Sequence, residues 1–266
     1  MITVLVFLGI GYSLKHLTLE AMEYLGKADK IVIDRYTSLY EDDPAELAKY
    51  TKGEVVYASR KDLEGEGMNK LIEEARFKTI VLAVPGDPFI ATTHDSLRVE
   101  AIKKGVEVKV VNSISVLTLI QSRLGLQAYR FGKTVTLVYP DYFKPYSTIE
   151  TIYENLNRRL HTIVLLDLRL EHGRAMTIHE AVEILLNLDD ELENKLDNSL
   201  AIGVARLSWR DERVQADLLP RLRNYDFPPP PHSLVIVSNP LPVEMEGLIL
   251  ICKLPELAGV ITGLNN

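Results

Sequence analysis

The most informative stretch of the sequence is Thr79-Ile-Val-Leu-Ala-Val-Pro-Gly-Asp-Pro-Phe-Ile-Ala-Thr-Thr-His94. Its beginning, Thr79–Val84, is a short β-branched run that is typical of a strand. Pro85 and Pro88 restrict the backbone on either side of Gly86-Asp87, so the strand is expected to run into a tight turn. Open α/β sheets bind their ligands beyond the carboxyl ends of their strands. The stretch therefore predicts an α/β sheet whose ligand edge carries Asp87.

Runs of the same kind recur on both sides of this stretch and alternate with amphipathic segments of helical length. That alternation is typical of a mostly parallel sheet with helices packed over it. In the first half, the predicted strands are Thr3–Leu8, Lys30–Asp34, Glu54–Tyr57, Thr79–Val84 and Glu107–Val111. They predict an α/β domain over residues 1–113 that contains the Gly-Asp-Pro loop.

Two helix starts can be recognised in this half. Asp43 followed by Pro44 supplies a capping side chain and a favoured first helical residue. Thr18 can cap a helix whose apolar periodicity predicts the burial of Leu19, Met22 and Leu25. Both helices would pack over the predicted sheet.

A second series of elements follows a helix predicted over Val116–Leu124. Its strands are expected at Thr134–Tyr139, Thr162–Leu166, Ser199–Ala205 and Leu234–Val237. Antiparallel pairing is expected in this half more than in the first, so we expect a second α/β domain over residues 114–266 with a mixed sheet. Two α/β domains of moderate size are expected to share a cleft.

Two local signals mark the second half. Thr177-Ile-His-Glu180 is a capping box, in which the end side chains satisfy backbone amides at the start of a helix over Ile178–Leu188. The run Pro228–Pro231 supplies no amide donors for a central strand. It is therefore expected to be a stiff surface connection that delivers His232 into the last strand.

Composition and charge exclude several classes of protein. With 30 Lys and Arg against 37 Asp and Glu, the net charge of −7 argues against direct binding of nucleic acid. No apolar run is long enough for a transmembrane helix, so no membrane partner is expected. The single cysteine, Cys252, lies in an apolar run and is expected to be a core thiol. A reducing, cytoplasmic location fits this cysteine usage.

The glycines of Leu8-Gly-Ile-Gly-Tyr12 follow the first predicted strand. They allow another backbone or a ligand to approach closely. The third glycine of a dinucleotide fingerprint is missing, and no Lys-Ser/Thr follows to make a phosphate-binding loop. An ordinary tight turn between strand and helix explains the glycines equally well.

Several longer strings together carry a family resemblance. They are Tyr36-Thr-Ser-Leu39, Pro85-Gly-Asp-Pro88 with Ala91-Thr-Thr-His94, Tyr129-Arg-Phe-Gly-Lys133, His161-Thr, Leu166-Asp167, Met176-Thr177 and Pro230-Pro-His232. In this order and spacing the chain resembles the archaeal diphthine synthases, a branch of the tetrapyrrole methylases. The Gly-Asp-Pro string is shared with the wider superfamily, whereas Tyr-Thr-Ser-Leu and Ala-Thr-Thr-His point to the diphthine branch.

The resemblance implies a homodimer whose subunits bind S-adenosylmethionine between two α/β domains and release S-adenosylhomocysteine. Carried over by position, the cofactor contacts would be Tyr12, Asp87, Ile90, Ser115, Val116, Leu166, Leu207 and His232. Tyr12 stands where the family pattern has an aliphatic residue, and Asn112-Ser-Ile-Ser115 replaces a more usual His-Ala-Pro-Ser. No metal is implied.

The residues themselves leave simpler roles open. Asp87 suits ribose hydroxyls or the positively charged amino-acid end of the cofactor, but an Asp in such a turn also caps it. The aliphatic contacts are equally compatible with a plain core role. His232 and Asp167 are candidates for catalysis. The simpler alternatives are a core or surface histidine with satisfied hydrogen bonds for His232 and a solvated turn for Asp167.

The implied substrate is translation elongation factor 2, on a histidine extended by an aminocarboxypropyl group whose primary amine receives three methyls. The methyl of the sulfonium is already activated, so the protein must mainly align a neutral amine with it and exclude water. Two alternatives remain. One is a methyltransferase for corrin or sirohaem precursors, and the other is a non-catalytic module that binds S-adenosylmethionine or another nucleotide.

Overall fold

The computed structural model describes residues 3–255 and consists of two compact units. Unit 1 comprises Met1–Val116 together with Arg169–Gly173, and unit 2 comprises Leu117–Leu168 and Arg174–Asn266. The chain thus passes from unit 1 to unit 2 three residues after the predicted boundary at 113, and a short segment of the second half clusters with unit 1.

Unit 1 contains a five-stranded sheet in the order β3-β2-β4-β1-β5, and all its strand pairs are parallel. The strands are β1 Val4–Gly9, β2 Lys30–Asp34, β3 Glu54–Ala58, β4 Thr79–Val84 and β5 Val108–Val111. Its helices are α1 Leu19–Lys27, α2 Arg60–Leu63, α3 Gly65–Ala75 and α4 Asp95–Lys103, with 3₁₀ turns η1 Leu14–His16 and η2 Pro44–Tyr50. The five predicted strands are confirmed, with small differences at their ends.

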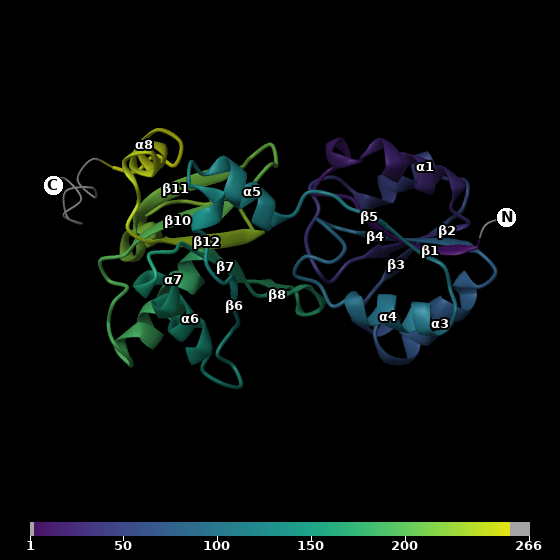
Figure 1. Ribbon diagram of the computed structural model, residues 1–266, viewed down its shortest axis with the longest axis horizontal. Coiled ribbons are helices and arrows are strands. Elements are labelled where there is room, and N and C mark those ends of the chain that lie inside the picture. The colour runs from purple at the N-terminus through teal and green to yellow at the C-terminus, as the bar shows by residue number, and fades with distance from the viewer. Residues whose placement is uncertain (1–2, 256–266) are drawn as a thin grey trace. The chain divides into compact units, whose positions relative to one another are not determined.

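Helices cover both faces of this sheet, with α1 on one side and α3 and α4 on the other (Figure 1). Alternate side chains of a strand point to opposite faces. In β1, Val4, Val6 and Leu8 accordingly pack in one cluster with Leu25 of α1. Leu5 and Phe7 pack in the other cluster with residues of α3 and α4. The sheet is therefore a central layer buried on both faces.

The helix start at Thr18 is confirmed, because its hydroxyl accepts a hydrogen bond from the Ala21 amide at 3.0 Å. The predicted burial of Leu19 is wrong, since its side chain is 87% exposed. The buried side chains of α1 are Ala21 and Leu25, four residues apart on one face. Leu19 precedes Ala21 by two residues and so points about 200° away from that face.

Unit 2 contains a mixed sheet in the order β11-β10-β12-β7-β6, in which β6 and β7 are parallel and the other pairs antiparallel. Its strands are β6 Val135–Leu137, β7 Thr162–Leu166, β10 Leu200–Ala205, β11 Arg213–Leu218 and β12 His232–Val237, and β8 Leu168–Arg169 pairs with β9 Arg174–Ala175. Its helices are α5 Val116–Arg123, α6 Tyr146–Asn157, α7 Ile178–Asp190 and α8 Pro242–Leu250, with 3₁₀ turns η3 Ala128–Arg130 and η5 Leu219–Asn224. The 3₁₀ turn η4 Leu170–His172 lies in the segment that clusters with unit 1. The mixed sheet is as predicted.

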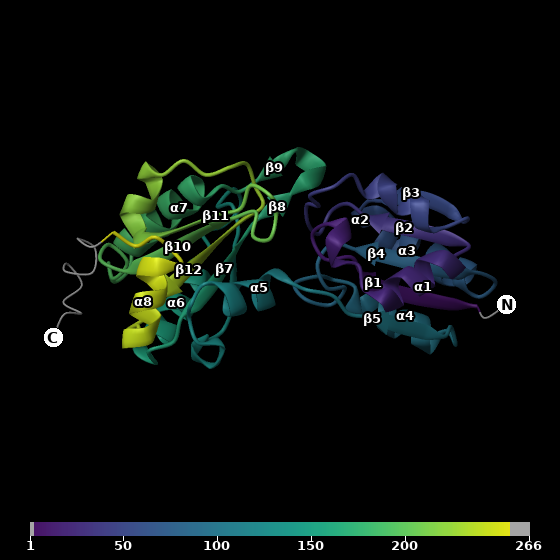
Figure 2. The same cartoon turned by 90° about the horizontal axis from the view of Figure 1, so that it is seen from above.

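Helices α6 and α7 cover one face of this sheet and α5 and α8 the other, as the two ribbon views show (Figures 1 and 2). The capping box of α7 is confirmed by reciprocal bonds between Thr177 and Glu180. The edge strand β11 was not predicted, because its apolar positions are interrupted by Gln215 and Asp217. Both are buried, and Asp217 accepts a hydrogen bond from the Tyr225 hydroxyl at 2.7 Å.

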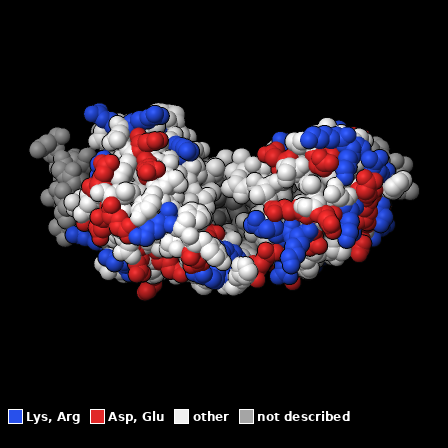
Figure 3. Space-filling view, turned by 90° about the horizontal axis from the view of Figure 1, so that it is seen from below, with Lys and Arg blue, Asp and Glu red and all other residues white. Residues whose placement is uncertain are grey.

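Cys252 is fully buried, as predicted, and its thiol donates to the Leu124 carbonyl oxygen at 3.3 Å. Between residues 3 and 255, no helix combines the length and the apolar character that crossing a membrane requires. Basic and acidic side chains are interspersed over the face drawn in Figure 3. That face therefore carries no extended patch of one sign.

Candidate functional site

The turns after β1 and β4 meet at the carboxyl edge of the unit 1 sheet. The Gly11 amide donates to the Gly86 carbonyl oxygen at 3.2 Å, and the Gly86 amide donates to that of Gly11 at 2.6 Å. A Cβ on Gly9 would lie 2.7 Å from the Gly86 oxygen. Gly86 itself has φ +77°, a left-handed conformation that favours glycine. Close approach between two backbones explains the glycines at both turns.

The carboxylate of Asp87 joins its own turn to the segment that follows β5. One oxygen accepts a hydrogen bond from the Phe89 amide at 3.0 Å, and the other accepts from the Asn112 side chain at 3.0 Å and the Ser113 amide at 3.2 Å. The side chain is buried, with 6% of its surface exposed. Asp87 therefore fixes the Gly-Asp-Pro turn against the segment after β5, in addition to any role toward a ligand.

Tyr12 occupies the space beside Gly86. Its hydroxyl accepts a hydrogen bond from the Val116 amide at 2.9 Å, and a Cβ on Gly86 would lie 2.8 Å from the same oxygen. Burial raises the pKa of Tyr12 to about 12, so the phenol is neutral at physiological pH. The structure thus brings together Tyr12, Asp87, Ser115 and Val116, which the sequence assigned to one site.

Two serine hydroxyls at the same edge are buried and have no hydrogen-bond partner among residues 3–255. They are Ser13, directly after Tyr12, and Ser113, whose amide binds Asp87. A buried hydroxyl without a partner is unusual and points to a polar ligand or an ordered water. Ser115 is also buried, at 2% exposure, whereas Ile90 is 41% exposed and available for an apolar contact.

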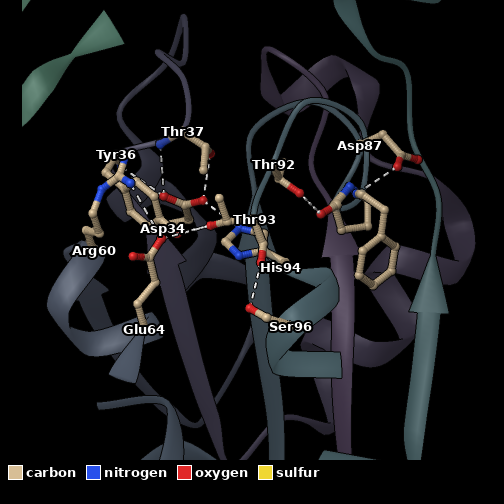
Figure 4. Close-up of polar contacts among 12 residues, drawn as sticks. Asp34, Tyr36, Thr37, Arg60, Glu64, Asp87, Thr92, Thr93, His94 and Ser96 are labelled. Carbon is tan, nitrogen blue, oxygen red and sulfur yellow. Dashed lines mark hydrogen bonds and ion pairs between the residues drawn. The ribbon is translucent and has the colours of Figure 1, made fainter. Parts of the chain in front are cut away.

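A second polar cluster lies beside the first, at the ends of β2 and β4 (Figure 4). Asp34 and His94 are both almost completely buried and lie 2.9 Å apart, from carboxylate oxygen to Nε2. The carboxylate of Asp34 also accepts hydrogen bonds from the Tyr36 amide at 2.8 Å, the Thr37 amide at 3.2 Å and the Thr37 hydroxyl at 2.6 Å. Asp34 therefore holds the turn that follows β2.

The outer part of this cluster is aromatic and charged. The Tyr36 hydroxyl lies 3.1 Å from that of Thr93, which donates to Glu64 at 3.0 Å. The guanidinium of Arg60 stands 4.9 Å from the centre of the Tyr36 ring. The two strings typical of the diphthine branch, Tyr36–Leu39 and Ala91–His94, thus meet in space, more than fifty residues apart in the chain.

Sequence reasoning missed Asp34, Arg60 and Glu64 as members of this cluster. A signal was available for Asp34, since it ends a predicted strand directly before the Tyr36 string. Nothing comparable marked Arg60 and Glu64, because α2 and the start of α3 bring them to the cluster through tertiary packing.

One end of the strands in the unit 2 sheet brings together Leu166, Leu207 and His232. Leu166 ends β7 and His232 begins β12, which is antiparallel to both β7 and β10. Leu207 follows the end of β10, and its neighbours Arg206 and Ser208 have φ of +50° and +72°. Leu207 thus has one left-handed residue on each side, which marks a strained turn of the kind that clusters at functional sites.

His232 is buried, and both nitrogens of its ring are occupied. The Ile178 amide donates to Nδ1 at 3.0 Å, so Nε2 carries the proton and donates to the Pro228 carbonyl oxygen at 2.6 Å. Burial lowers the pKa of His232 to about 4. This arrangement does not suit the predicted role as a proton acceptor. It fixes the proline run, which lies outside any strand as predicted, against the start of α7.

Asp167 is held by backbone contacts. Its carboxylate accepts a hydrogen bond from the Tyr139 amide at 3.2 Å, and its backbone pairs with Leu137 and Met176. Its partly exposed side chain organises the strand ends in unit 2, between β7 and β8. In the part of the chain that the structure describes, no group of three or more His, Cys, Asp or Glu side chains is arranged to hold a metal ion.

Comparison with known proteins shows which family this chain matches. Residues 4–223 match the family described as tetrapyrrole (corrin/porphyrin) methylases. The chain is 52% identical to the diphthine synthase of Staphylothermus marinus, over 95% of each chain. It is 36% identical to that of Methanocaldococcus jannaschii, over 94% of this chain and 99% of the other.

Solved structures agree. A crystal structure of diphthine synthase matches with a TM-score of 0.88 and 32% identity, covering 97% of this chain and 99% of the other. A structure described as a putative diphthine synthase from Entamoeba histolytica matches with a TM-score of 0.83 and 30% identity, over 94% and 98% of the two chains.

Proposed function

This chain belongs to the tetrapyrrole methylase family and, within it, to the diphthine synthases, and from that premise we propose that it methylates translation elongation factor 2. It is an S-adenosylmethionine-dependent methyltransferase of diphthamide biosynthesis. The acceptor is the amine of the aminocarboxypropyl-modified histidine, which receives three methyl groups. The observation that carries this function is the near full-length similarity to diphthine synthases, supported by the meeting of the Tyr36–Leu39 and Ala91–His94 strings in one cluster.

We infer that S-adenosylmethionine binds at the carboxyl edge of the unit 1 sheet. The residues there fit such a group, since the buried hydroxyls of Ser13 and Ser113 have no hydrogen-bond partner among residues 3–255. Gly9 and Gly86 keep the edge free of side chains where the backbones meet. Tyr12, Asp87, Ile90, Ser115 and Val116 would hold the cofactor on this side. Leu166, Leu207 and His232 of unit 2 belong to the proposal as contacts carried over from the family resemblance.

The cofactor supplies an activated methyl on a positively charged sulfur, so the chain needs no covalent nucleophile. Its residues must orient the acceptor amine in line with that methyl and exclude water. The amine must be neutral before each transfer. Because both ring nitrogens of His232 are engaged within unit 2, we propose that water, and not His232, removes the proton. The buried Asp34–His94 pair keeps the neighbouring turn rigid.

We propose that the enzyme works as a homodimer in the cytoplasm, where the elongation factor acts. Helix α8 supports a dimer, because it and the residues beside it expose apolar side chains of Leu241, Val243, Ile249, Leu250 and Ile251. Leu248, Cys252 and Leu254 of the same stretch are buried within the subunit. Light scattering at low micromolar concentration tests the dimer, and a monomeric mass would contradict it.

Labelled S-adenosylmethionine tests the function against its nearest alternative. We expect label on elongation factor 2 that carries the aminocarboxypropyl histidine and none on a tetrapyrrole precursor. Label on the tetrapyrrole alone would favour methylation of corrin or sirohaem precursors. Binding of the cofactor without label on either acceptor would favour a non-catalytic module.

A further inference from the structure

A cavity of about 830 Å³ lies at the carboxyl ends of β2 and β3 in unit 1. Its lining includes Tyr36, Ser38 and Leu39 of the string that follows β2, and Tyr57 near the end of β3. Pro85, the residue before the Gly86-Asp87 turn, lines it as well. The cavity therefore lies beside the proposed cofactor site within unit 1. An acceptor site must adjoin the cofactor, and this cavity does.

Arg35 lines this cavity and is exposed. Its guanidinium stands 4.7 Å from the centre of the Tyr57 ring. Stacking on an aromatic face orients the planar guanidinium and leaves its N–H groups available at the rim. The Arg35 side chain forms no ion pair or hydrogen bond with another residue in the range 3–255.

The backbone around Arg35 is fixed on both sides. The Arg35 amide donates to the Ala58 carbonyl oxygen at 3.1 Å. The Asp34 carboxylate accepts from the Tyr36 amide at 2.8 Å, and the buried His94 holds that carboxylate. A charge on such a rigid turn loses little freedom when it binds a ligand, which favours specific recognition.

The other charged residues of the lining already have partners. Asp43 accepts from the Ala45 amide at 2.9 Å, and Asp62 accepts from the amide and hydroxyl of Ser59 at 2.8 and 2.7 Å. Glu171, which clusters with unit 1, accepts from the Arg60 amide at 3.2 Å. With Asp34 bound as described, Arg35 alone of the five charged lining residues is without a polar partner in the described chain.

We propose that Arg35 binds the carboxylate of the acceptor's aminocarboxypropyl group in this cavity. A planar guanidinium can bind a carboxylate through two parallel N–H bonds, which fixes direction as well as position. The carboxylate and the amine belong to the same short chain, so anchoring one places the other. Arg35 thereby selects an acceptor that carries both groups. The inference rests on the proposed function, since it takes the acceptor from it.

The test compares Arg35→Gln, Arg35→Lys and the wild-type enzyme. For Arg35→Gln we expect KM for the modified elongation factor to rise on the order of 10- to 100-fold, as for a lost charged hydrogen bond. The affinity for S-adenosylmethionine and the melting temperature should stay unchanged. Arg35→Lys should recover only part of the loss, because lysine keeps the positive charge but lacks the two parallel N–H donors of the guanidinium. Lys103→Gln removes an exposed charge from α4 outside the cavity and should have no effect.

A second acceptor isolates the carboxylate. When that carboxylate is converted to the amide, the wild-type enzyme should lose the same factor in KM, and Arg35→Gln should lose nothing further. An unchanged KM in Arg35→Gln, or an equal loss of cofactor affinity, would overturn the role of Arg35 while methyl transfer by the wild-type enzyme still upheld the proposed function. Absence of any transfer by the wild-type enzyme would overturn both.

Discussion

The hydroxyl of Tyr12 accepts a hydrogen bond from the Val116 amide at 2.9 Å, which ties the turn after β1 to the last residue of unit 1 before the chain enters unit 2. In Tyr12→Phe this partly buried amide loses its acceptor, so we expect the free energy of unfolding to fall by about 1 to 2 kcal/mol. Denaturant titration measures the change. Tyr129→Phe is the control, because Tyr129 is 80% exposed, and it should leave stability as it is. Equal stability of both variants would count against the Tyr12 bond.

Gly86→Ala tests the contact on the other side of Tyr12. The new Cβ would lie 2.8 Å from the Tyr12 hydroxyl, and φ at Gly86 is +77°. Gly105→Ala is a matched control, because φ there is +74° but no atom lies within 4 Å of the position that its new methyl group would take. Both variants should lose about 1 kcal/mol from backbone strain, and Gly86→Ala should lose at least about 1 kcal/mol more from the clash. A loss of the same size in both would show that the contact with Tyr12 does not destabilise Gly86→Ala.

Asp87→Ala should weaken binding of S-adenosylmethionine roughly 10- to 150-fold, the effect of losing a buried charged hydrogen bond. Part of the effect follows from release of Asn112 and Ser113, which the carboxylate holds in place. Calorimetric titration of the folded variant decides the matter. The exposed Asp197→Ala serves as control. Wild-type affinity in Asp87→Ala would remove this carboxylate from the site.

His232 makes stability depend on pH. Burial lowers its pKa from the ordinary 6.5 to about 4, so between these values the unfolded chain binds more protons than the folded one. The contribution of His232 to the free energy of unfolding should therefore be fully present above pH 6.5. It should decline as the pH falls toward 4, by about 3 kcal/mol at most. Burial lowers the pKa of His161 as well, which acts in the same direction.

Denaturation midpoints at pH 7 and pH 5 measure this decline. His232→Asn should be less stable at pH 7 and should lose less on acidification than the wild-type protein. His172→Asn, at an exposed position, should keep the full decline. If His232→Asn kept it too, the acid sensitivity would have to come from another group.

The sequence predicted the parts of the fold that depend on local patterns. Strands such as Lys30–Asp34 follow from β-branched runs, and the capping box at Thr177 predicted the start of α7 correctly. The strand at Arg213–Leu218 escaped prediction because Gln215 and Asp217 are buried through hydrogen bonds that only the folded chain supplies.

The site shows the same limit. The strand-end position of Asp87 was visible in the sequence, but its three donors come from segments up to 26 residues away. The Asp34–His94 pair spans 60 residues and depends on β2 and β4 being neighbours in the sheet. The engagement of both His232 nitrogens likewise depends on α7 beginning beside β12. Tertiary pairing decides these contacts.

Mass spectrometry of elongation factor 2, after incubation with the enzyme and S-adenosylmethionine, measures the proposed methylation itself. The factor that carries the aminocarboxypropyl histidine should gain the mass of three methyl groups at that residue, and the factor with an unmodified histidine should gain nothing. No mass gain on the modified factor, with cofactor binding shown in the same preparation, would contradict the assignment of this chain as the enzyme that methylates it.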